Sequence, residues 1–312
     1  IMGLCNNRIV VKVGTSTLTN DAGKSDLRAI DRLVCTLADI QNMGYEVILV
    51  SSGAIAVGRN KLNMHEKPDS MRMKQAAAAV GQCSLMYLYD KFFGDYDKTV
   101  AQILLNAEDI EQEEKKENLT NTFDALLEMG IIPIVNENDS VSYKEIESED
   151  RLFGDNDMLS SVVSVLCRAK RLVIFSDIDG FYDSDPRLHP NAKLIKEIRQ
   201  IDESVYSLAG GAGSRRGTGG MRTKLQAAEL AASQGIDTIV TNGKHPEALY
   251  DNRRELYLSE IRTACNKDIY DIYTEKAVSR IQVFIFSKPL SENCFFLFLS
   301  YLLQLCLFYK AL

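Results

Sequence analysis

The chain has 312 residues, of which 46% are hydrophobic and 25% charged, a balance typical of a globular protein and not of a disordered or fibrous one. Its formal net charge is -7 and no basic block stands out, which argues against a nucleic-acid partner. The seven cysteines form no CxxC pair, so a zinc site and a disulfide framework are disfavoured, and we expect reduced thiols in a cytoplasmic protein.

Apolar runs and helical patterns alternate as far as about residue 250. Six apolar runs predict strands, at residues 8–13, 45–50, 99–105, 131–135, 171–175 and 237–241. Between them we expect helices at residues 26–43, 54–61, 70–93, 157–169 and 220–234, and a long charged helical stretch ending at residue 129. Strands that are apolar throughout and separated by helices predict an α/β fold. We expect this fold to be a three-layer sandwich with a mostly parallel central sheet. Ligands of such folds bind beyond the carboxyl ends of the strands.

Two segments at strand ends are suited to anions. Lys12 ends the first strand, and Gly14 and hydroxyl residues follow it. Small residues let a phosphate approach the backbone N–H groups, and a lysine supplies positive charge. The segment 51–54 (SSGA) joins the second strand to a helix, where free N–H groups and the helix dipole favour an anion. An ordinary turn and a simple serine N-cap explain the same two segments without any ligand.

Two polar clusters, NEND at residues 136–139 and GDND at residues 154–157, adjoin apolar elements. Carboxylates and amides together can bind an ammonium group, hold a lysine or contact a hydrated Mg²⁺ ion. Turn chemistry is the alternative, because Asn and Asp are frequent in turns.

The segment 217–224 (GTGGMRTK) places three glycines and a threonine before an amphipathic helix, with a lysine in its first turns. We interpret it as a phosphate-binding helix start in preference to a flexible linker. The chain has no GxxxxGK[ST], HRD, DFG or GxSxG motif, and its three histidines lie outside the glycine-rich segments. No histidine base or catalytic triad is therefore visible.

Seven short segments, taken in chain order, resemble the motifs of the amino acid kinase family. They are VVKVGTS (10–16), SSGAIAVGR (51–59), AVGQ (79–82), NEND (136–139), GDND (154–157), DIDGFYDSDPR (177–187) and GTGGMRTKLQAA (217–228). Any one of them is modest evidence, whereas all seven in order are specific. Within the family, NEND and GDND together are most similar to the members that phosphorylate glutamate, and less so to those that act on aspartate, carbamate or uridylate.

The resemblance implies phosphorylation of the side-chain carboxylate of L-glutamate by ATP with Mg²⁺, the first step of proline biosynthesis. It implies that Lys12 and Lys224 contact the phosphates and that Asp157 organises both lysines. The implied glutamate-binding residues are Ser52, Gly53, Asn136, Asp139, Asp155 and Asn156. The implied ATP-binding residues are Lys12, Gly14, Ser176, Asp177, Thr218, Gly219, Gly220, Met221, Arg222, Thr223 and Lys224. A homo-oligomer (dimer or tetramer) and feedback inhibition by proline are implied too, and no residue is implied as a metal ligand.

This reaction agrees with the missing base. A glutamate side chain has a pKa of about 4.3, so it is ionised at neutral pH and attacks without a general base. The difficulty is repulsion between two anions, which two lysines, Mg²⁺ and helix N-termini reduce. Two other functions stay open: a kinase for another small acid such as aspartate, N-acetylglutamate or carbamate, and a catalytically silent sensor of an amino acid or nucleotide.

We expect residues 1–262 to form the kinase domain and residues 263–312 a C-terminal extension of unknown structure, without the PUA domain of many bacterial relatives. Residues 294–309 are almost wholly apolar but shorter than the roughly 20 residues of a membrane span. They would pack on the protein or a partner, or reflect an error in the gene sequence; a membrane anchor is the least favoured reading. The polar segment 141–153 is expected to be a hairpin or a loop that excludes water from the site.

Overall fold

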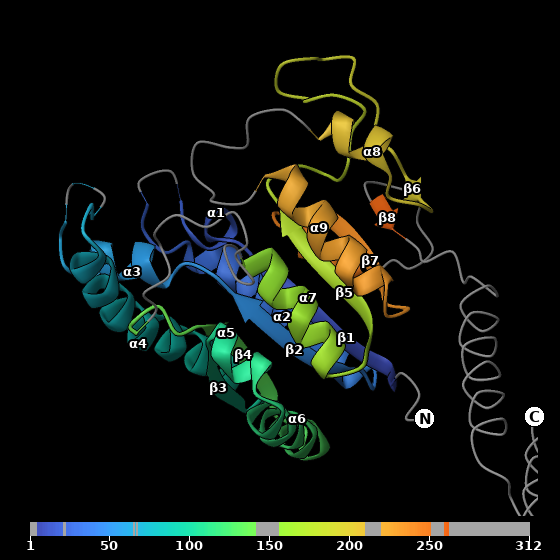
Figure 1. The fold of residues 1–312 in the computed structure, drawn as a ribbon. Coiled ribbons are helices and arrows are strands. Elements are labelled where there is room, and N and C mark those ends of the chain that lie inside the picture. The colour runs from blue at the N-terminus through green and yellow to red at the C-terminus, as the bar shows by residue number, and fades with distance from the viewer. Residues whose placement is uncertain are drawn as a thin grey trace, which may run out of the picture. The chain divides into compact units, whose positions relative to one another are not determined.

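The computed structural model describes residues 5–20, 23–64, 66, 68–141, 156–209, 220–250 and 259–261. Its central feature is one sheet with the strand order β3-β4-β2-β1-β5-β7-β8-β6 (Figure 1). The strands are β1 (Cys5–Val13), β2 (Glu46–Ser51), β3 (Val100–Leu105), β4 (Ile132–Glu137), β5 (Ala169–Ser176), β6 (Glu197–Ile198), β7 (Asp237–Asn242) and β8 (Ser259–Ile261). The first five and β7 are mutually parallel and confirm the six predicted strands.

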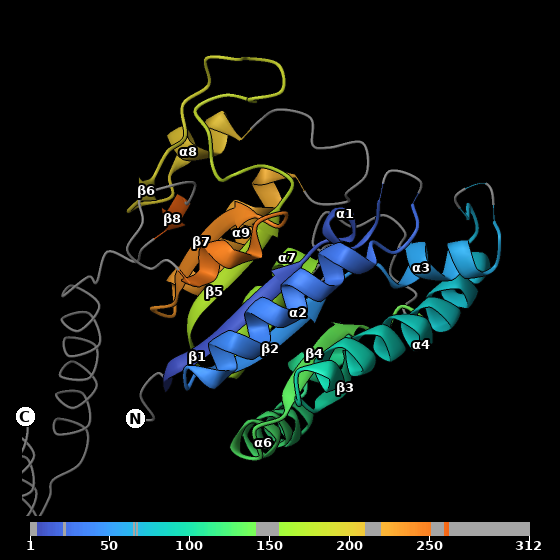
Figure 2. The ribbon, with the colours of Figure 1, turned by 180° about the vertical axis from the view of Figure 1, so that it is seen from behind.

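Helices cover both faces of this sheet. They are α1 (Thr15–Leu18), α2 (Leu27–Asn42), α3 (Ala54–Lys61), α4 (Met71–Asp95), α5 (Ala107–Glu111), α6 (Glu113–Glu128), α7 (Asn156–Leu166), α8 (Glu203–Leu208), α9 (Met221–Ala232) and the 3₁₀ turn η1 (Pro246–Tyr250). The helices α6, α7 and α9 lie on one face of the sheet (Figure 1), and α2 and α4 lie on the other (Figure 2). Their buried side chains form a hydrophobic core on each face. The predicted three-layer α/β sandwich is confirmed.

Strand alternation decides which side chains meet which helices. In β1, Val10 packs into the core under α6, α7 and α9, whereas Ile9 and Val11 pack under α2 and α4. Because successive side chains point to opposite faces, Lys12 lies on the same face as Val10. By the same period of two, Asn136 in β4 shares the face of Ile134, under α2 and α4. Strand alternation therefore places Lys12 on one face of the sheet and Asn136 on the other.

Some boundaries differ from the sequence-based expectation. The helix predicted at 157–169 ends at Leu166 and β5 begins at Ala169, because Arg168 adopts a left-handed conformation, with φ of 52°, that turns the chain at once. The short elements α1, α5, α8, β6 and β8 were not predicted as separate elements, since a few residues show no clear periodicity. The loop predicted at 141–153, except Val141, and the extension 263–312 lie outside the described residues, so these expectations stay predictions.

None of the helices in the described part of the chain combines the length and the apolar character that crossing a membrane requires.

Two glycines let α3 and α4 approach at backbone distance. A Cβ atom placed on Gly58 would lie 1.8 Å from the carbonyl oxygen of Ala77, and one on Gly81 would lie 1.7 Å from that of Ala54. Backbone atoms cannot move away as the end of a flexible side chain can, so any larger residue must force the helices apart. The start of α3, directly after β2, thus fixes where α4 lies over the sheet.

We therefore expect Gly81→Ala to lower the free energy of unfolding by about 2 kcal/mol or more, because overpacking at a backbone contact has no cheap relief. Gly94→Ala is the matched control, since it lies in the same helix and its added Cβ would meet nothing within 4 Å. That variant should be unchanged or more stable by at most about 1 kcal/mol. Urea unfolding of both proteins measures the difference, and equal midpoints would contradict the packing described here.

Candidate active site

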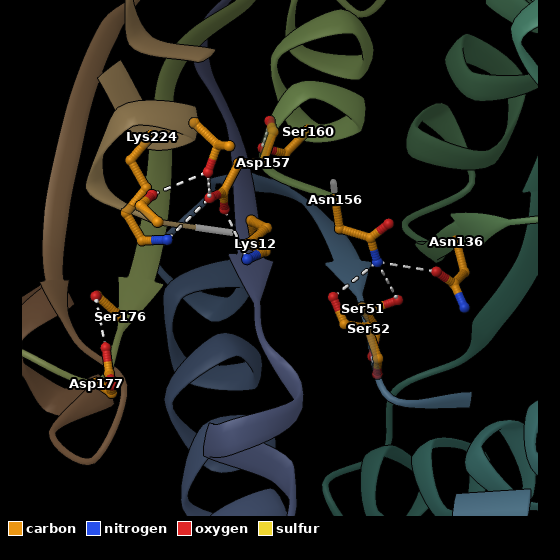
Figure 3. A network of polar contacts seen from close by, with 12 residues as sticks. Lys12, Ser51, Ser52, Asn136, Asn156, Asp157, Ser160, Ser176, Asp177 and Lys224 are labelled. Carbon is orange, nitrogen blue, oxygen red and sulfur yellow. Dashed lines mark hydrogen bonds and ion pairs between the residues drawn. The ribbon is translucent and has the colours of Figure 1, made fainter. Parts of the chain in front are cut away.

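A buried carboxylate bridges two lysines at the carboxyl ends of the central strands (Figure 3). Lys12 Nζ lies 2.6 Å from Asp157 Oδ1, and Lys224 Nζ lies 2.9 Å from Asp157 Oδ2. The hydroxyl of Thr223 donates to the same Oδ2 atom at 3.2 Å. Four predicted site residues from three separate elements thus meet at one carboxyl group.

The fold explains this meeting. Lys12 lies near the end of the central strand β1, on the face covered by α7 and α9. Asp157 is the second residue of α7, and Lys224 lies in the first turns of α9. Both helices begin above the carboxyl ends of the parallel strands, as the connections of an α/β sheet require. The two helix starts therefore bring the carboxylate and the second lysine to the first lysine.

The electrostatics of Lys12, Asp157 and Lys224, called the triad below, favour an anionic ligand. The side chain of Asp157 is fully buried, and those of Lys12 and Lys224 are 6% and 9% exposed. Burial would raise the pKa of the Asp157 carboxyl, but the charges and hydrogen bonds of the two lysines outweigh it and hold that pKa well below its ordinary value. The carboxylate is thus ionised at neutral pH. Two ammonium groups share a single carboxylate, which leaves a net positive charge in a poorly solvated place.

A cluster of amides and hydroxyls adjoins the triad. The Nδ2 atom of Asn156 donates to the Ser51 carbonyl oxygen at 3.2 Å, to Ser52 Oγ at 2.7 Å and to Asn136 Oδ1 at 3.0 Å. Asn156 and Asp157 are consecutive residues, so the start of α7 carries one member of each group (Figure 3). The structure thus brings together the predicted residues Ser52, Asn136 and Asn156.

Two residues of α4 complete this cluster, and neither was predicted from the sequence as a site residue. Gln82 Oε1 accepts from Asn136 Nδ2 at 3.0 Å, and the hydroxyls of Tyr89 and Ser51 lie 2.8 Å apart. Burial raises the pKa of Tyr89 above its ordinary value, against a smaller lowering by Ser51, so Tyr89 is uncharged. The string AVGQ at 79–82 was a signal for Gln82, whereas Tyr89 carries no signal that distinguishes it from an ordinary core residue.

The predicted nucleotide-binding residues are more spread out. Ser176 ends β5 and donates to Asp177 Oδ1 at 3.3 Å, while Arg187 contacts Asp177 Oδ2 at 2.6 Å. Arg222 lies over the ring of Tyr206, 5.7 Å from its centre, so its charge is engaged beside the site.

Glycines lie at the starts of three helices in this region, α1, α3 and α9. Gly14 lies beside the Lys12 ammonium group, and a Cβ atom placed on it would come within 3.6 Å of Nζ. Gly220 is the N-cap residue of α9 and makes no side-chain cap hydrogen bond to that helix. Gly53 precedes α3 with φ of 102°, a conformation that only glycine adopts easily. Because these glycines have no Cβ atom, a ligand can approach the backbone closely at the three helix starts.

Two further predicted residues, Met221 and Asp139, lie near these groups in the sequence of elements. Met221 begins α9 and packs on the small core around Phe181, and Asp139 follows β4, half-buried. Asp155, Thr218 and Gly219 lie outside the described residues. Within the part of the chain that the structure describes, no group of three or more His, Cys, Asp or Glu side chains could hold a metal ion.

Known proteins resemble this chain over most of its length. The chain is 57% identical over 246 residues to glutamate 5-kinase of Clostridium perfringens, which covers 79% of this chain and 91% of the relative. It is 48% identical over 257 residues to glutamate 5-kinase of Clostridium acetobutylicum, covering 81% and 94%.

Solved structures share the fold at much lower identity. Carbamate kinase from Giardia lamblia bound to AMP-PNP is 14% identical with a TM-score of 0.57, covering 83% of this chain and 99% of that one. The isopentenyl phosphate kinase of T. acidophilum is 16% identical with a TM-score of 0.55, covering 81% and 99%. The model of the amino acid kinase family matches residues 7–242, and the chain belongs to that family.

Proposed function

We propose that this chain is a glutamate 5-kinase, which transfers the γ-phosphoryl group of ATP to the side-chain carboxylate of L-glutamate and supplies the first step of proline biosynthesis. The observation that carries the proposal is the start of α7. Asn156 there belongs to a cluster of amides suited to an amino acid, and Asp157 holds two lysines suited to phosphates. The relatives named glutamate 5-kinase support the choice of substrate.

The chemistry needs charge neutralisation more than proton transfer. The glutamate carboxylate is ionised at neutral pH, so its oxygen can attack the γ-phosphorus while ADP leaves, and no proton has to be removed. The two described histidines, His189 and His245, are exposed, consistent with a site without a histidine base. What opposes the reaction is repulsion between the incoming carboxylate and the phosphate oxygens. Lys12 and Lys224 reduce that repulsion at fixed positions, the form of catalysis that dominates phosphoryl transfer.

The amide cluster positions the amino acid in this proposal. Ser52 and Gly53 follow the end of β2, where Asn156 bonds to Ser52, and Asn136 and Asp139 lie in and just after β4. By the family resemblance, Asp155 also binds the amino acid. Carboxylate and amide oxygens bind the α-ammonium group, and N–H and hydroxyl donors bind the α-carboxylate. Gly14, Ser176, Asp177 and, by the family resemblance, residues 218–224 bind ATP, with its phosphates toward the start of α9, whose N-cap Gly220 offers no side chain.

Magnesium enters with the nucleotide. Because Asp157 is engaged by two lysines, and because no cluster of metal-ligating side chains lies among the described residues, phosphate oxygens and water would supply most of the ligands, as is usual for Mg²⁺. Bound there, the ion neutralises phosphate charge. No described side chain is assigned as a ligand of this ion.

Three further properties follow from the family resemblance and complete the proposal. We expect a homo-oligomer, feedback inhibition by proline and a cytoplasmic location. Cys35 and Cys83 are free thiols, consistent with a reducing compartment.

The proposed reaction forms an acyl phosphate, which hydroxylamine traps as a hydroxamate. With ATP, Mg²⁺ and hydroxylamine, we expect ADP and hydroxamate in equal amounts when L-glutamate is the acceptor. Aspartate, N-acetylglutamate, carbamate and a sample without acceptor run beside it. If hydroxamate or ADP forms only with another acid, that acid is the substrate in place of L-glutamate. If folded protein that binds ATP shows no turnover with any acceptor, the result favours a catalytically silent sensor.

Lys224→Ala should lower kcat by about two orders of magnitude or more, a typical loss for one preorganised electrostatic contact. Lys116→Ala is the matched control, because Lys116 lies on α6 and forms an exposed ion pair with Glu113, which contributes little. Steady-state kinetics at saturating ATP and glutamate give both values. A Lys224→Ala enzyme with near-normal kcat would remove this lysine from the mechanism.

A further inference from the structure

Gln82 connects α4 to the proposed glutamate subsite, although it belongs neither to the triad nor to the predicted binding residues. We infer that Gln82 is a positioning residue: through Asn136 it holds the side-chain oxygen of Asn156 toward the substrate, where this oxygen recognises a free α-ammonium group. The inference rests on the proposed function and adds to it the residue that orients the amino acid subsite.

The direction of the hydrogen bonds is fixed at one end by the backbone. The carbonyl oxygen of Ser51 can only accept, so the Asn156 atom 3.2 Å away must be the Nδ2 donor. Nδ2 also meets Ser52 Oγ and Asn136 Oδ1. A reversed Asn156 amide would set its oxygen against the Ser51 carbonyl oxygen, which cannot donate, and against Asn136 Oδ1, whereas the Ser52 hydroxyl can serve either orientation. The amide of Asn156 therefore has a single favourable orientation.

This polarity passes along the chain of amides to Gln82. Because Asn136 accepts through Oδ1, its Nδ2 atom points to the opposite side, where Gln82 Oε1 accepts at 3.0 Å. Asn136 is only 2% exposed and Gln82 only 9%, so water cannot easily replace that acceptor. Without it, a buried amide donor would lack a partner, and the Asn136 side chain would rotate to find one.

The orientation has a consequence for the ligand. All three acceptors lie on the Nδ2 side of Asn156, and Figure 3 shows its oxygen pointing away from them. Among the described residues, none donates a hydrogen bond to that oxygen. An amide oxygen held outward binds an ammonium group and repels a carboxylate. The α-ammonium group of an amino acid fits this requirement, whereas an acid without that group leaves the oxygen unsatisfied.

Gln82 is held rigidly enough for this role. It follows Gly81, whose backbone lies against Ala54 at the start of α3, and α3 begins directly after Ser52 and Gly53. Tyr89, two turns farther along α4, bonds to Ser51 from the same side. The acceptor oxygen of Gln82 is thus fixed relative to the strand ends that carry the rest of the cluster.

The test compares glutamate with glutarate, the same diacid without the amino group, in wild-type enzyme, Gln82→Met and Gln82→Glu. Glutarate is measured as a competitive inhibitor against glutamate. Gln82→Met keeps the length but removes the acceptor, and it should raise the KM for glutamate about tenfold or more. The KM for ATP, and the inhibition constant of glutarate, should stay within about twofold. Gln82→Glu retains an acceptor oxygen and should restore the glutamate KM to within about threefold of wild type.

The outcomes separate this inference from the function on which it rests. A wild-type enzyme without glutamate-dependent hydroxamate would overturn the proposed function. An active wild-type enzyme whose Gln82→Met variant keeps its glutamate KM, or loses glutamate and glutarate equally, would overturn the role of Gln82 alone. Thermal unfolding is recorded for each protein. If Gln82→Met does not fold, Gln82→Asn, which withdraws the acceptor by one methylene, replaces it under the same criteria.

Discussion

The ionised carboxylate of Asp157, held between two ammonium groups, is the constraint around which this molecule is built. A fully buried carboxylate is unfavourable unless it is paired and hydrogen-bonded, and here Lys12, Lys224 and Thr223 supply those partners. The partners come from β1 and α9, so the pairing requires the strand alternation of β1 and the placement of two helix starts above it. A fold that satisfies this carboxylate also assembles the positive charge that a phosphoryl-transfer site needs.

One helix start aligns two kinds of binding group. Asn156 and Asp157 follow each other in α7, so the amide cluster and the lysine pair cannot shift relative to each other without deforming that helix. On the opposite face, the glycine contact between α3 and α4 fixes the position of α4, whose residues Gln82 and Tyr89 bond to the amide cluster. Both proposed substrates are thereby positioned by rigid elements, which is how an enzyme converts a reaction between two anions into a nearly unimolecular step.

Much of this arrangement could be predicted from the sequence. Continuous apolar runs such as residues 45–50 identified the six parallel strands, and the glycine-rich segment before Lys224 identified the start of α9. The orientation of the amides could not be predicted, because it depends on the distance between β4 and α4 and on the carbonyl of Ser51. Gln82 and Tyr89 share the inward face of α4 with Leu85 and Phe93, so a periodic pattern cannot distinguish them from core residues. The early end of α7 depends on the left-handed Arg168, which propensity does not reveal.

In this site Asp157 acts by holding the two lysines, and a double-mutant cycle between Asp157 and Lys224 measures that coupling. The four proteins are wild type, Asp157→Asn, Lys224→Ala and the double variant, and kcat at saturating ATP and glutamate is measured for each. Residues that act as one unit show strongly non-additive effects. We expect the double variant to lose little more activity than the worse single variant. Losses that multiply, so that the double variant falls by the product of the two single effects, would show that Asp157 acts independently of Lys224 and would contradict this account.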